Sequence, residues 1–395
     1  MVEWKKLGEV ASYYRGVTYN KKQEVPFNSG GTKILRANNI TLETNSLNFE
    51  DVKEISSNVI IKDFQWLYPN DILICAGSGS KEHVGKVAYI SSPLKYAYGG
   101  FMGKIIASEG LKPRFLFHIF SSSIFKKYLD VALNSTTINN LNSTLVNDFQ
   151  IPIPSLSEQE RIVGILDTFT ASIDNIKAQI EQRRKQYEHY RNTLLTFHKD
   201  DDSVEWKTLG EIGTMYKGKG IQKSDFVDNG KPCIHYGQVH TFYGFTATKT
   251  KSFVSEEMYS CCNKAKKGDL IIATTSEDVE ACCKATVWLG DSEPAISGDA
   301  HFFRHNQNPK YIGYLFMTEM FASQKRVAAV GAKVTRVHGE SIMKFKFPFP
   351  SLARQQEIVY ILDTFEASIT NLEAQLEQRQ KQYEYYREEL LTNLS

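Results

Sequence analysis

Apolar residues recur with alternating spacings of four and three along two stretches of the chain, residues 152–196 and 348–392. In the first stretch they are Ile162, Leu166, Phe169, Ile173, Ile176, Ile180, Tyr187, Tyr190 and Leu194. In the second they are Ile358, Leu362, Phe365, Ile369, Leu372, Leu376, Tyr383, Tyr386 and Leu390. This spacing is typical of a coiled-coil seam, in which the one polar position carries Arg183 or Arg379. The pattern predicts two long helices.

The two stretches are copies of each other at a constant offset, identical at about two thirds of their positions. A shorter repeat heads each half, where Val2-Glu-Trp-Lys-Lys-Leu-Gly-Glu returns as Val204-Glu-Trp-Lys-Thr-Leu-Gly-Glu. Because the halves are equivalent, a pseudo-twofold arrangement with antiparallel helices is the economical solution. About 40 helical residues give a rod near 60 Å, at roughly 1.5 Å per residue. The predicted order is a module over 1–151, a helix over 152–198, a second module over 199–347 and a second helix over 348–395.

Proline and capping signals mark where the helices begin. The pairs Pro152/Pro154 and Pro348/Pro350 disfavour helix before them. Ser157 followed by Glu160 matches a capping box, which predicts the start of the first helix.

The modules share short apolar strands and amphipathic helices. Asp71-Ile-Leu-Ile-Cys and Asp269-Leu-Ile-Ile-Ala predict buried strands that begin at a turn. Pro113 and Pro309 predict helix starts, since proline is favoured at the first helical position. We expect an α+β fold with two mixed α/β modules, largely antiparallel sheets and two long antiparallel coiled-coil helices.

Identity between the two helices extends beyond the seam. Packing at the seam does not require this identity, and the modules have diverged far more than the helices. We therefore predict that the repeated polar residues face solvent and bind one kind of partner twice. The alternative is a coiled-coil spacer or a dimerisation stalk. The candidate partner-binding residues are Gln159, Gln179, Gln182 and Lys185, with their counterparts Gln355, Gln375, Gln378 and Lys381.

The segment before each helix keeps its apolar residues while its polar residues change. In residues 135–142 and 331–338, Ile138 matches Val334 and Leu141 matches Val337, so these four are expected to be buried. The exchanged polar residues are what reading two different base sequences needs, since Asn pairs with adenine and Arg with guanine. Unconstrained surface loops diverge in the same way. The candidate DNA-binding residues are Arg15, Lys33, Arg36, Asn38, Asn39, Thr136, Thr137, Asn139, Asn140 and Asn142, and in the second half Lys217, Lys219, Gln222, His235, Tyr236, Gln238, Lys333, Thr335, Arg336 and His338.

Composition changes this picture little. The chain has 395 residues, 42% hydrophobic and 23% charged, which agrees with two globular modules. Its net charge of +2 gives only a weak overall field, so any DNA site must be local. No apolar run approaches the roughly 20 residues of a membrane span, and the first residues lack the apolar core of a signal peptide. We expect the chain in the cytoplasm.

Cysteines and histidines give little support for catalysis. Five of the six cysteines lie in the second module, as Cys233, Cys261, Cys262, Cys282 and Cys283. Adjacent cysteines lack the two-residue spacer common in zinc sites, so buried reduced thiols are expected and no metal is assigned. No nucleophile elbow or dinucleotide fingerprint is present. Two alternatives stay open: a zinc-dependent enzyme in the second module, and a protein-interaction scaffold without nucleic-acid binding.

The duplicated motifs resemble a known family. Pro152-Ile-Pro-Ser-Leu-Ser-Glu-Gln-Glu-Arg-Ile-Val, its counterpart from Pro348, the Trp-Lys-x-Leu-Gly-Glu heads and the Asp-Ile-Leu-Ile strand are similar to the specificity subunit of type I restriction-modification systems. The second copy departs by having Ala353-Arg354 where the first has Ser157-Glu158.

The resemblance implies two target-recognition domains, each binding one half of a bipartite, asymmetric double-stranded DNA target. It also implies that the helices set the spacing and bind two methyltransferase subunits, through which the restriction motor subunits join. The chain itself would be non-catalytic and without cofactors, with S-adenosylmethionine, ATP and Mg²⁺ on the partner subunits.

Overall fold

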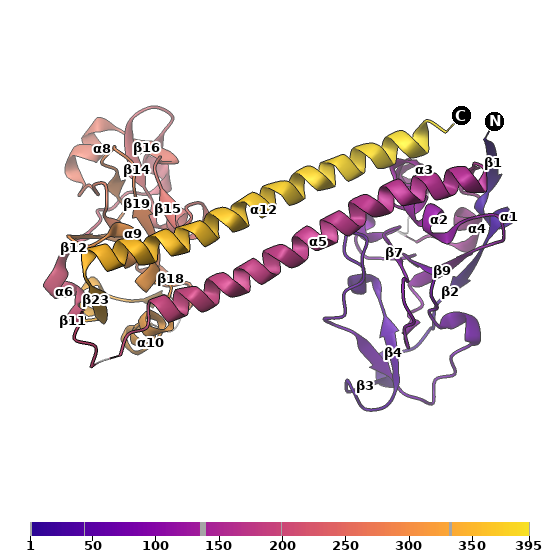
Figure 1. Cartoon of the computed structure of the whole chain (residues 1–395), viewed down its shortest axis with the longest axis horizontal. Coiled ribbons are helices and arrows are strands. Elements are labelled where there is room, and N and C mark those ends of the chain that lie inside the picture. Colours follow the sequence, from indigo (N-terminus) through magenta and orange to yellow (C-terminus); the bar gives the residue numbers. More distant parts are fainter. Residues whose placement is uncertain (1, 43, 135–139, 199, 332–333, 395) are drawn as a thin grey trace. The chain divides into compact units, whose positions relative to one another are not determined.

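The computed structural model describes residues 2–42, 44–134, 140–198, 200–331 and 334–394. The chain divides into two compact units, residues 1–177 with 374–395 and residues 178–373. Each unit contains one module together with parts of the two long helices, α5 (Leu156–Leu194) and α12 (Leu352–Thr392) (Figure 1). Within the described ranges, no helix is long and apolar enough to span a membrane.

The first unit is built on two four-stranded sheets. One has the order β2-β9-β6-β7 and is antiparallel, and the other has the order β3-β5-β4-β8, in which only β4 and β8 are parallel. The strands are β2 (Ala11–Arg15), β9 (Met102–Ala107), β6 (Ile72–Cys75), β7 (Val87–Tyr89), β3 (Glu24–Val25), β5 (Lys53–Ile55), β4 (Thr32–Leu35) and β8 (Ala97–Tyr98). A separate pair, β1 (Glu3–Lys6) and β10 (Gln150–Ile153), leads into α5. The helices of this unit are α1 (Leu7–Val10), α2 (Pro113–Phe120), α3 (Ser123–Asn134) and α4 (Ser143–Asn147).

The second unit repeats this plan and adds further strands and helices to it. Its main sheet has the order β12-β21-β17-β19-β15, so a fifth strand covers the edge that β7 forms in the first unit. The strands are β12 (Gly213–Lys217), β21 (Ala300–His305), β17 (Leu270–Ala273), β19 (Lys284–Trp288), β15 (Thr246–Ala247), β13 (Phe226–Val227), β16 (Ser252–Val254), β14 (Lys231–Ile234) and β20 (Ala295–Ile296), with the pairs β11 (Val204–Thr208) to β23 (Lys346–Pro350) and β18 (Thr275–Ser276) to β22 (Thr335–Arg336). The helices are α6 (Leu209–Ile212), α7 (Tyr236–Thr241), α8 (Glu256–Cys261), α9 (Pro309–Leu315), α10 (Glu319–Ala328) and α11 (Gly339–Ile342).

The predicted α+β fold is confirmed, including the Asp-led buried strands β6 and β17 and the proline-initiated helices α2 and α9. The helix segments within each unit run antiparallel. Phe169 of α5 stacks on Tyr386 of α12 with ring centroids 5.2 Å apart, and Tyr190 stacks on Phe365 at 5.1 Å. The two polar seam residues also fit this packing, because Arg379 lies 5.7 Å from the Phe169 ring and Arg183 lies 5.8 Å from the Phe365 ring.

The first long helix begins two residues earlier than the capping pattern predicts. Helix α5 starts at Leu156, and the backbone N–H of Glu158 donates to Ser155 Oγ at 3.3 Å. The second helix has the same cap, since the N–H of Arg354 donates to Ser351 Oγ at 3.3 Å. The prediction of a Ser157 cap is therefore wrong, because the serine directly after the proline pair takes that role.

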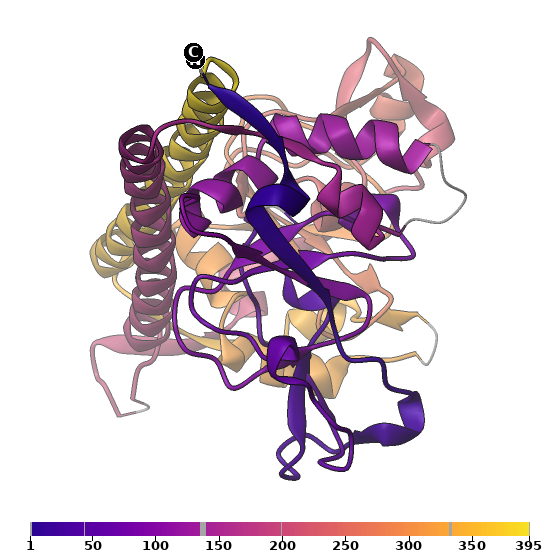
Figure 2. The ribbon, with the colours of Figure 1, turned by 90° about the vertical axis from the view of Figure 1, so that its right-hand side faces the viewer.

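In the first unit the core extends from the main sheet onto both long helices. Ile162 and Leu166 of α5 and Leu391 of α12 are buried with Phe115 and Ile119 of α2. Figure 2 looks onto this unit and shows α5 along one side of it. The burial of about one side chain per turn from each helix fixes the module to the helices.

Candidate functional site

A groove of about 1430 Å³ lies on the first unit, where the segments after β4, β6 and β8 come together. It contains three of the predicted DNA-binding residues, Arg36, Asn38 and Asn140. The small residues Gly77, Ser78 and Gly79, which follow β6, and Gly99 and Gly100, which follow β8, line it as well. Their lack of bulk lets a ligand approach the backbone closely.

Two residues of this groove are not among the predicted DNA-binding residues. Phe101 lines it with 73% of its surface exposed, so its ring is open to a ligand in the groove. Lys86 also lines the groove, and its Nζ donates to the Ile40 carbonyl at 2.6 Å. Burial lowers the pKa of Lys86. Phe101 was not a candidate because it is apolar, and Lys86 directly precedes strand β7.

The segment after β4 is organised around Asp51. Arg36 Nη2 lies 2.8 Å from Asp51 Oδ2, and Asn38 Nδ2 donates to the same oxygen at 3.2 Å. Hydrogen bonds from Lys53 and Arg36 and their positive charges lower the pKa of Asp51, so it stays ionised. These contacts hold Arg36 and Asn38 with exposed polar groups beside the groove.

Asn39 does not share this exposure. Its side chain is fully buried, where Oδ1 accepts from the Arg36 N–H at 2.9 Å and Nδ2 donates to the Asn48 carbonyl at 3.2 Å. The prediction that Asn39 contacts DNA is wrong, because its side chain is buried and forms hydrogen bonds with backbone groups of its own turn.

The segments before α5 and α12 place Asn140 and Arg336 at the same position of their units. Asn140 forms a bridge with Gly77 after β6, and Arg336 of β22 pairs with Thr275 after β17. Arg15 Nη2 donates to Asn140 Oδ1 at 3.1 Å, whereas Arg336 Nη2 donates to Asp299 Oδ1 at 3.0 Å. One backbone position thus presents an amide in one unit and a guanidinium in the other.

The expected anchors of these segments are only partly confirmed. Leu141 and Val337 are fully buried, as predicted. Val334 is 55% exposed, so its prediction as an anchor is wrong. Its turn is held instead by backbone hydrogen bonds of 2.9 Å in both directions between Val330 and Arg336. Ile138 and the candidate residues Thr136, Thr137, Asn139 and Lys333 lie outside the described residues.

The remaining candidates divide into internal and exposed groups. His235 is buried and accepts the Gly237 N–H through Nδ1 at 3.1 Å, while Gln238 donates to Ser252 Oγ at 2.6 Å. These two side chains bond within and beside α7, where Gln238 is half-buried, and Thr335 is buried, so their role in DNA binding stays a prediction. Asn142 caps α4, accepting the Leu145 N–H at 2.9 Å, and Lys33 Nζ lies 4.8 Å from the Phe27 ring. The exposed candidates of the second unit are Lys217, Lys219, Gln222, Arg336 and His338, with Tyr236 half-buried.

Two repeated residues of the long helices hold each module in place. Gln159 is fully buried; its Oε1 accepts the Lys112 N–H at 2.8 Å, and its Nε2 donates to Pro154 O at 3.0 Å. Gln355 is buried in the same way, accepting the Asn308 N–H at 3.0 Å and donating to Pro350 O at 2.9 Å. The expectation that these glutamines face solvent is wrong. Each forms hydrogen bonds with one backbone group just before a module helix, α2 or α9, and with another just before a long helix, α5 or α12.

Asp167 and Asp363 form the second repeated anchor. Asp167 Oδ1 lies 2.8 Å from Arg114 Nε and 3.0 Å from His118 Nε2, and His118 Nδ1 lies 3.2 Å from the Tyr383 hydroxyl. Burial lowers the pKa of His118 more than Asp167 raises it. In the second unit Tyr314 takes the place of His118, and its hydroxyl donates to Asp363 Oδ1 at 2.8 Å. Module packing therefore accounts for part of the identity between the helices.

The other candidate partner-binding residues of the helices are exposed. They are Gln179, Gln182, Lys185, Gln375, Gln378 and Lys381. Lys185 pairs with Glu181 and Lys381 with Glu377, each one turn away at 2.5 Å. Exposed pairs of this kind contribute little to stability, so the fold does not require these two lysines.

Four of the five cysteines of the second unit are buried, and Cys261 is exposed. Within the described part of the chain, no three His, Cys, Asp or Glu side chains gather as metal ligands.

Comparisons with known proteins bear on this arrangement. A family model described as type I restriction modification DNA specificity domain matches residues 1–183 and 202–381. The specificity subunit of the Escherichia coli type I restriction enzyme EcoR124I/EcoR124II is 32% identical over 263 residues, which cover 62% of this chain and 63% of that protein. The chain thus aligns with slightly less than two thirds of that relative.

Two further matches extend over nearly the whole chain. A Haemophilus influenzae protein provisionally named as a type I restriction enzyme specificity subunit is 27% identical over 415 residues, covering 100% of this chain and 96% of that protein. A solved structure on the complex assembly and conformational transition of the type I R-M system contains a chain with a TM-score of 0.62 and 16% identity, covering 99% of this chain and 96% of that chain. The structural likeness supports the fold.

Proposed function

This chain belongs to the family of type I restriction-modification specificity subunits, which are non-catalytic. From that premise we propose that it reads a bipartite, asymmetric DNA target. Residues 1–151 and 199–347 are its two target-recognition domains. Each reads one half-site, and the helices over 152–198 and 348–395 set the unread spacing. Catalysis, with S-adenosylmethionine, ATP and Mg²⁺, belongs to partner subunits.

The observation that carries this proposal is the exchange of Asn140 for Arg336 at one position of the repeated fold. Both residues sit beside the small-residue loop that follows the Asp-led strand, next to backbone that a phosphate can approach. Asn and Arg favour different bases when they pair bidentately in the major groove. Two copies of one backbone with different polar tips fit two unlike half-sites.

The groove of the first unit supports the same reading. Arg36, Lys86 and the candidate Asn38 supply positive charge and amide groups around it. The exposed ring of Phe101 offers an apolar surface for a base or sugar. Phosphate contacts should dominate affinity, so binding should weaken as salt rises.

The exposed repeated faces of α5 and α12 are the proposed docking surfaces for two methyltransferase subunits, through which restriction motor subunits join. The repeated residues Gln182, Lys185, Gln378 and Lys381 are exposed and contribute little to the fold, so a partner bound twice explains their identity. The structural relative solved in work on complex assembly is consistent with such a role.

A domain exchange tests the bipartite reading. Residues 1–151 are replaced by the equivalent module of another family member, and the methylated sites are mapped by methylome sequencing of cells carrying the partner subunits. We expect one half-site to change while the other half-site and the spacing stay the same. A change in both half-sites refutes independent reading.

A helix insertion tests the spacing role. One heptad is inserted at equivalent positions of both helices, which keeps the seam in register and adds about 10 Å, roughly three base pairs. We expect a wider spacer between unchanged half-sites in the methylome. An unchanged spacer would remove the helices from any role in measuring distance.

A further inference from the structure

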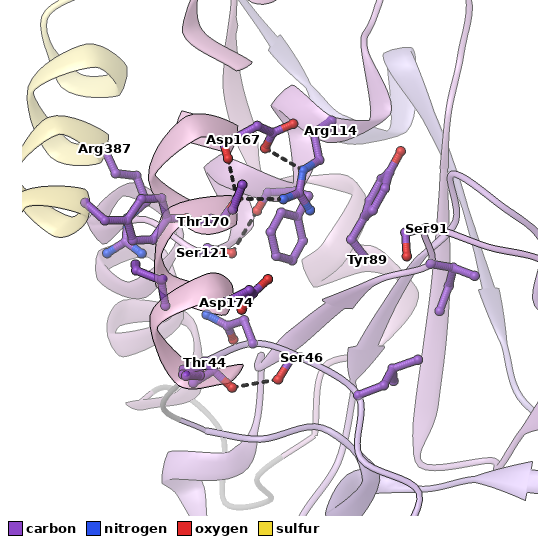
Figure 3. A pocket seen from close by; sticks show the side chains of 18 of the residues that line it. Thr44, Ser46, Tyr89, Ser91, Arg114, Ser121, Asp167, Thr170, Asp174 and Arg387 are labelled. Atoms are coloured by element: carbon purple, nitrogen blue, oxygen red, sulfur yellow. Dashed lines mark hydrogen bonds and ion pairs between the residues drawn. The ribbon is translucent and has the colours of Figure 1, made fainter. Parts of the chain in front are cut away.

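A second cavity of the first unit, of about 1060 Å³, lies between the main sheet and the long helices (Figure 3). Tyr89 and Ser91, in and just after β7, face it from one side. Thr170 and Asp174 of α5 face it from the other, and Arg387 of α12 closes one end. None of these residues belongs to the DNA-facing groove, so this cavity needs a separate explanation.

One wall of the cavity is the edge of strand β7, where no further strand pairs and where the Val87 N–H donates to Asn45 Oδ1 at 3.5 Å. Strand β7 is the last strand of its sheet, and the N–H of Ile90 points back into that sheet, donating to Asp71 O at 2.9 Å. Because successive backbone groups alternate in direction, the N–H groups of Tyr89 and Ser91 point to the open side. Among the described residues, neither of these two N–H groups has a hydrogen-bond partner. An exposed edge of this kind is a template for a further strand.

The second unit has that further strand. Val287 of β19 corresponds to Tyr89, because each pairs with the first residue of the Asp-led strand, Leu270 or Ile72. The N–H of Val287 donates to Phe245 O at 2.9 Å, and the N–H of Leu289 donates to Ala247 O at 2.8 Å. Strand β15 therefore runs parallel to β19 and satisfies the two groups that are open in the first unit.

The first unit cannot fill this place with its own equivalent segment. Asn45 has a positive φ of 49°, which turns the chain, and Leu47 pairs back onto Ile40. In the second unit the Phe245 ring stacks on the Tyr314 ring, with their centroids 4.3 Å apart. The Phe245 ring also packs beside Gly313. Position 313 corresponds to Phe117 of α2, whose ring lines the cavity with its centroid 5.8 Å from that of Tyr89.

We propose that an extended segment of a methyltransferase subunit adds to β7 as a parallel strand and fills this cavity. This inference rests on the proposed function, since Lys177, Gln380 and Glu384 line the cavity from the same helices that the partner is proposed to grip. Backbone recognition by the Tyr89 and Ser91 N–H groups demands an extended peptide. The residue facing Phe117 should be small, because that ring already lines the cavity.

The two units differ in this respect, so the added strand binds once per chain. The second unit supplies β15 from its own sequence, and only the first has an open edge. Two methyltransferase subunits with identical sequence would therefore make unequal contacts, one with an ordered strand and one without it.

Hydrogen exchange on the full chain, alone and with its methyltransferase subunit, tests the proposal. We expect the amides of Tyr89 and Ser91 to become protected in the complex, while those of Val287 and Leu289 are protected in both states. Protection of the exposed α5 and α12 faces without any change at 87–91 overturns the strand addition and leaves the proposed docking intact. Absence of protection at all of these places overturns the docking as well.

Two matched pairs of variants sharpen the test. Ala171→Trp fills the cavity from an exposed position of α5, and Ala367→Trp is its control at the equivalent exposed position of α12. Ser91→Pro removes one N–H from the open edge, and Ser91→Ala keeps it. We expect Ala171→Trp and Ser91→Pro to weaken subunit assembly about tenfold, as the loss of one or two backbone hydrogen bonds implies, with both controls near the parent affinity. Equal affinities for all four variants, with unchanged thermal unfolding, overturn the proposal.

Discussion

Replacing Gln159 by leucine is expected to destabilise the first unit without disturbing the exposed faces of the helices. Leucine fills a similar volume but cannot accept the Lys112 N–H at 2.8 Å or donate to Pro154 O at 3.0 Å and Gly110 O at 3.1 Å. Pro154 O is buried, and the Lys112 N–H is partly buried. Leaving such groups without partners costs about 1–3 kcal/mol each, which leucine burial offsets only in part. We expect a net loss of about 3 kcal/mol.

Thermal and urea unfolding measure this loss. For a unit of this size, about 3 kcal/mol corresponds to a fall in Tm of roughly 6–12 °C. Gln378→Leu is the matched control, because Gln378 is exposed in the same unit and should change stability by less than about 0.5 kcal/mol. Gln355→Leu should repeat the loss in the second unit, since Gln355 makes the equivalent contacts.

The refuting result is specific. If Gln159→Leu unfolds like the parent protein but loses affinity for the methyltransferase subunit, the glutamine acts at a partner surface and the argument from its burial fails.

Three further outcomes are expected. His118→Tyr should make the stability of the protein depend less on pH in the acid range. Burial holds the pKa of His118 below its value of about 6.5 in the unfolded chain. Below that pH the unfolded chain binds the proton and the folded protein does not, so the parent protein loses stability. Urea unfolding midpoints at pH 7.5 and 5.5 measure this, and an equal change of midpoint with pH in variant and parent contradicts it. The second unit already has a tyrosine, Tyr314, at the equivalent position. Arg336→Asn should reduce discrimination at one base pair of one half-site by about 1–3 kcal/mol in a binding array, whereas a uniform loss across all sequences points to a phosphate contact. Raising salt from about 50 to 200 mM should weaken DNA binding about 10³-fold or more if six or more phosphates are contacted, and a flat salt response argues against the groove as a DNA site.

Much of the architecture follows from local patterns. The spacing of Ile162, Leu166 and Phe169 predicts one face of α5, and the structure buries the first two in the core of the first unit. The duplication predicts antiparallel pairing, because only that arrangement makes Phe169 on Tyr386 equivalent to Phe365 on Tyr190. Proline positions predict the starts of α2 and α9, since proline restricts its own backbone wherever it stands.

The candidate site was less predictable, and the reason lies in contacts between distant residues. Asn38 and Asn39 are identical neighbours in the sequence, yet Asn38 is exposed beside the groove and Asn39 is buried inside its turn. Gln159 and Gln182 likewise look alike on a helix until the backbone of Lys112, 47 residues away, is placed against one of them. A polar side chain has the same sequence signature whether it binds a partner or satisfies the protein's own backbone.

The sequence by itself determined the duplication, the two helices, the seam and the mixed modules, because each depends on periodicity or on the conformational limits of individual residues. Only the tertiary structure decided which repeated residues anchor the modules, which remain exposed, and that β7 is open where β19 is covered by β15. The second unit places Phe245 beside Gly313, whereas the first unit has Phe117 at the equivalent position, and such neighbours meet only after distant segments have packed together.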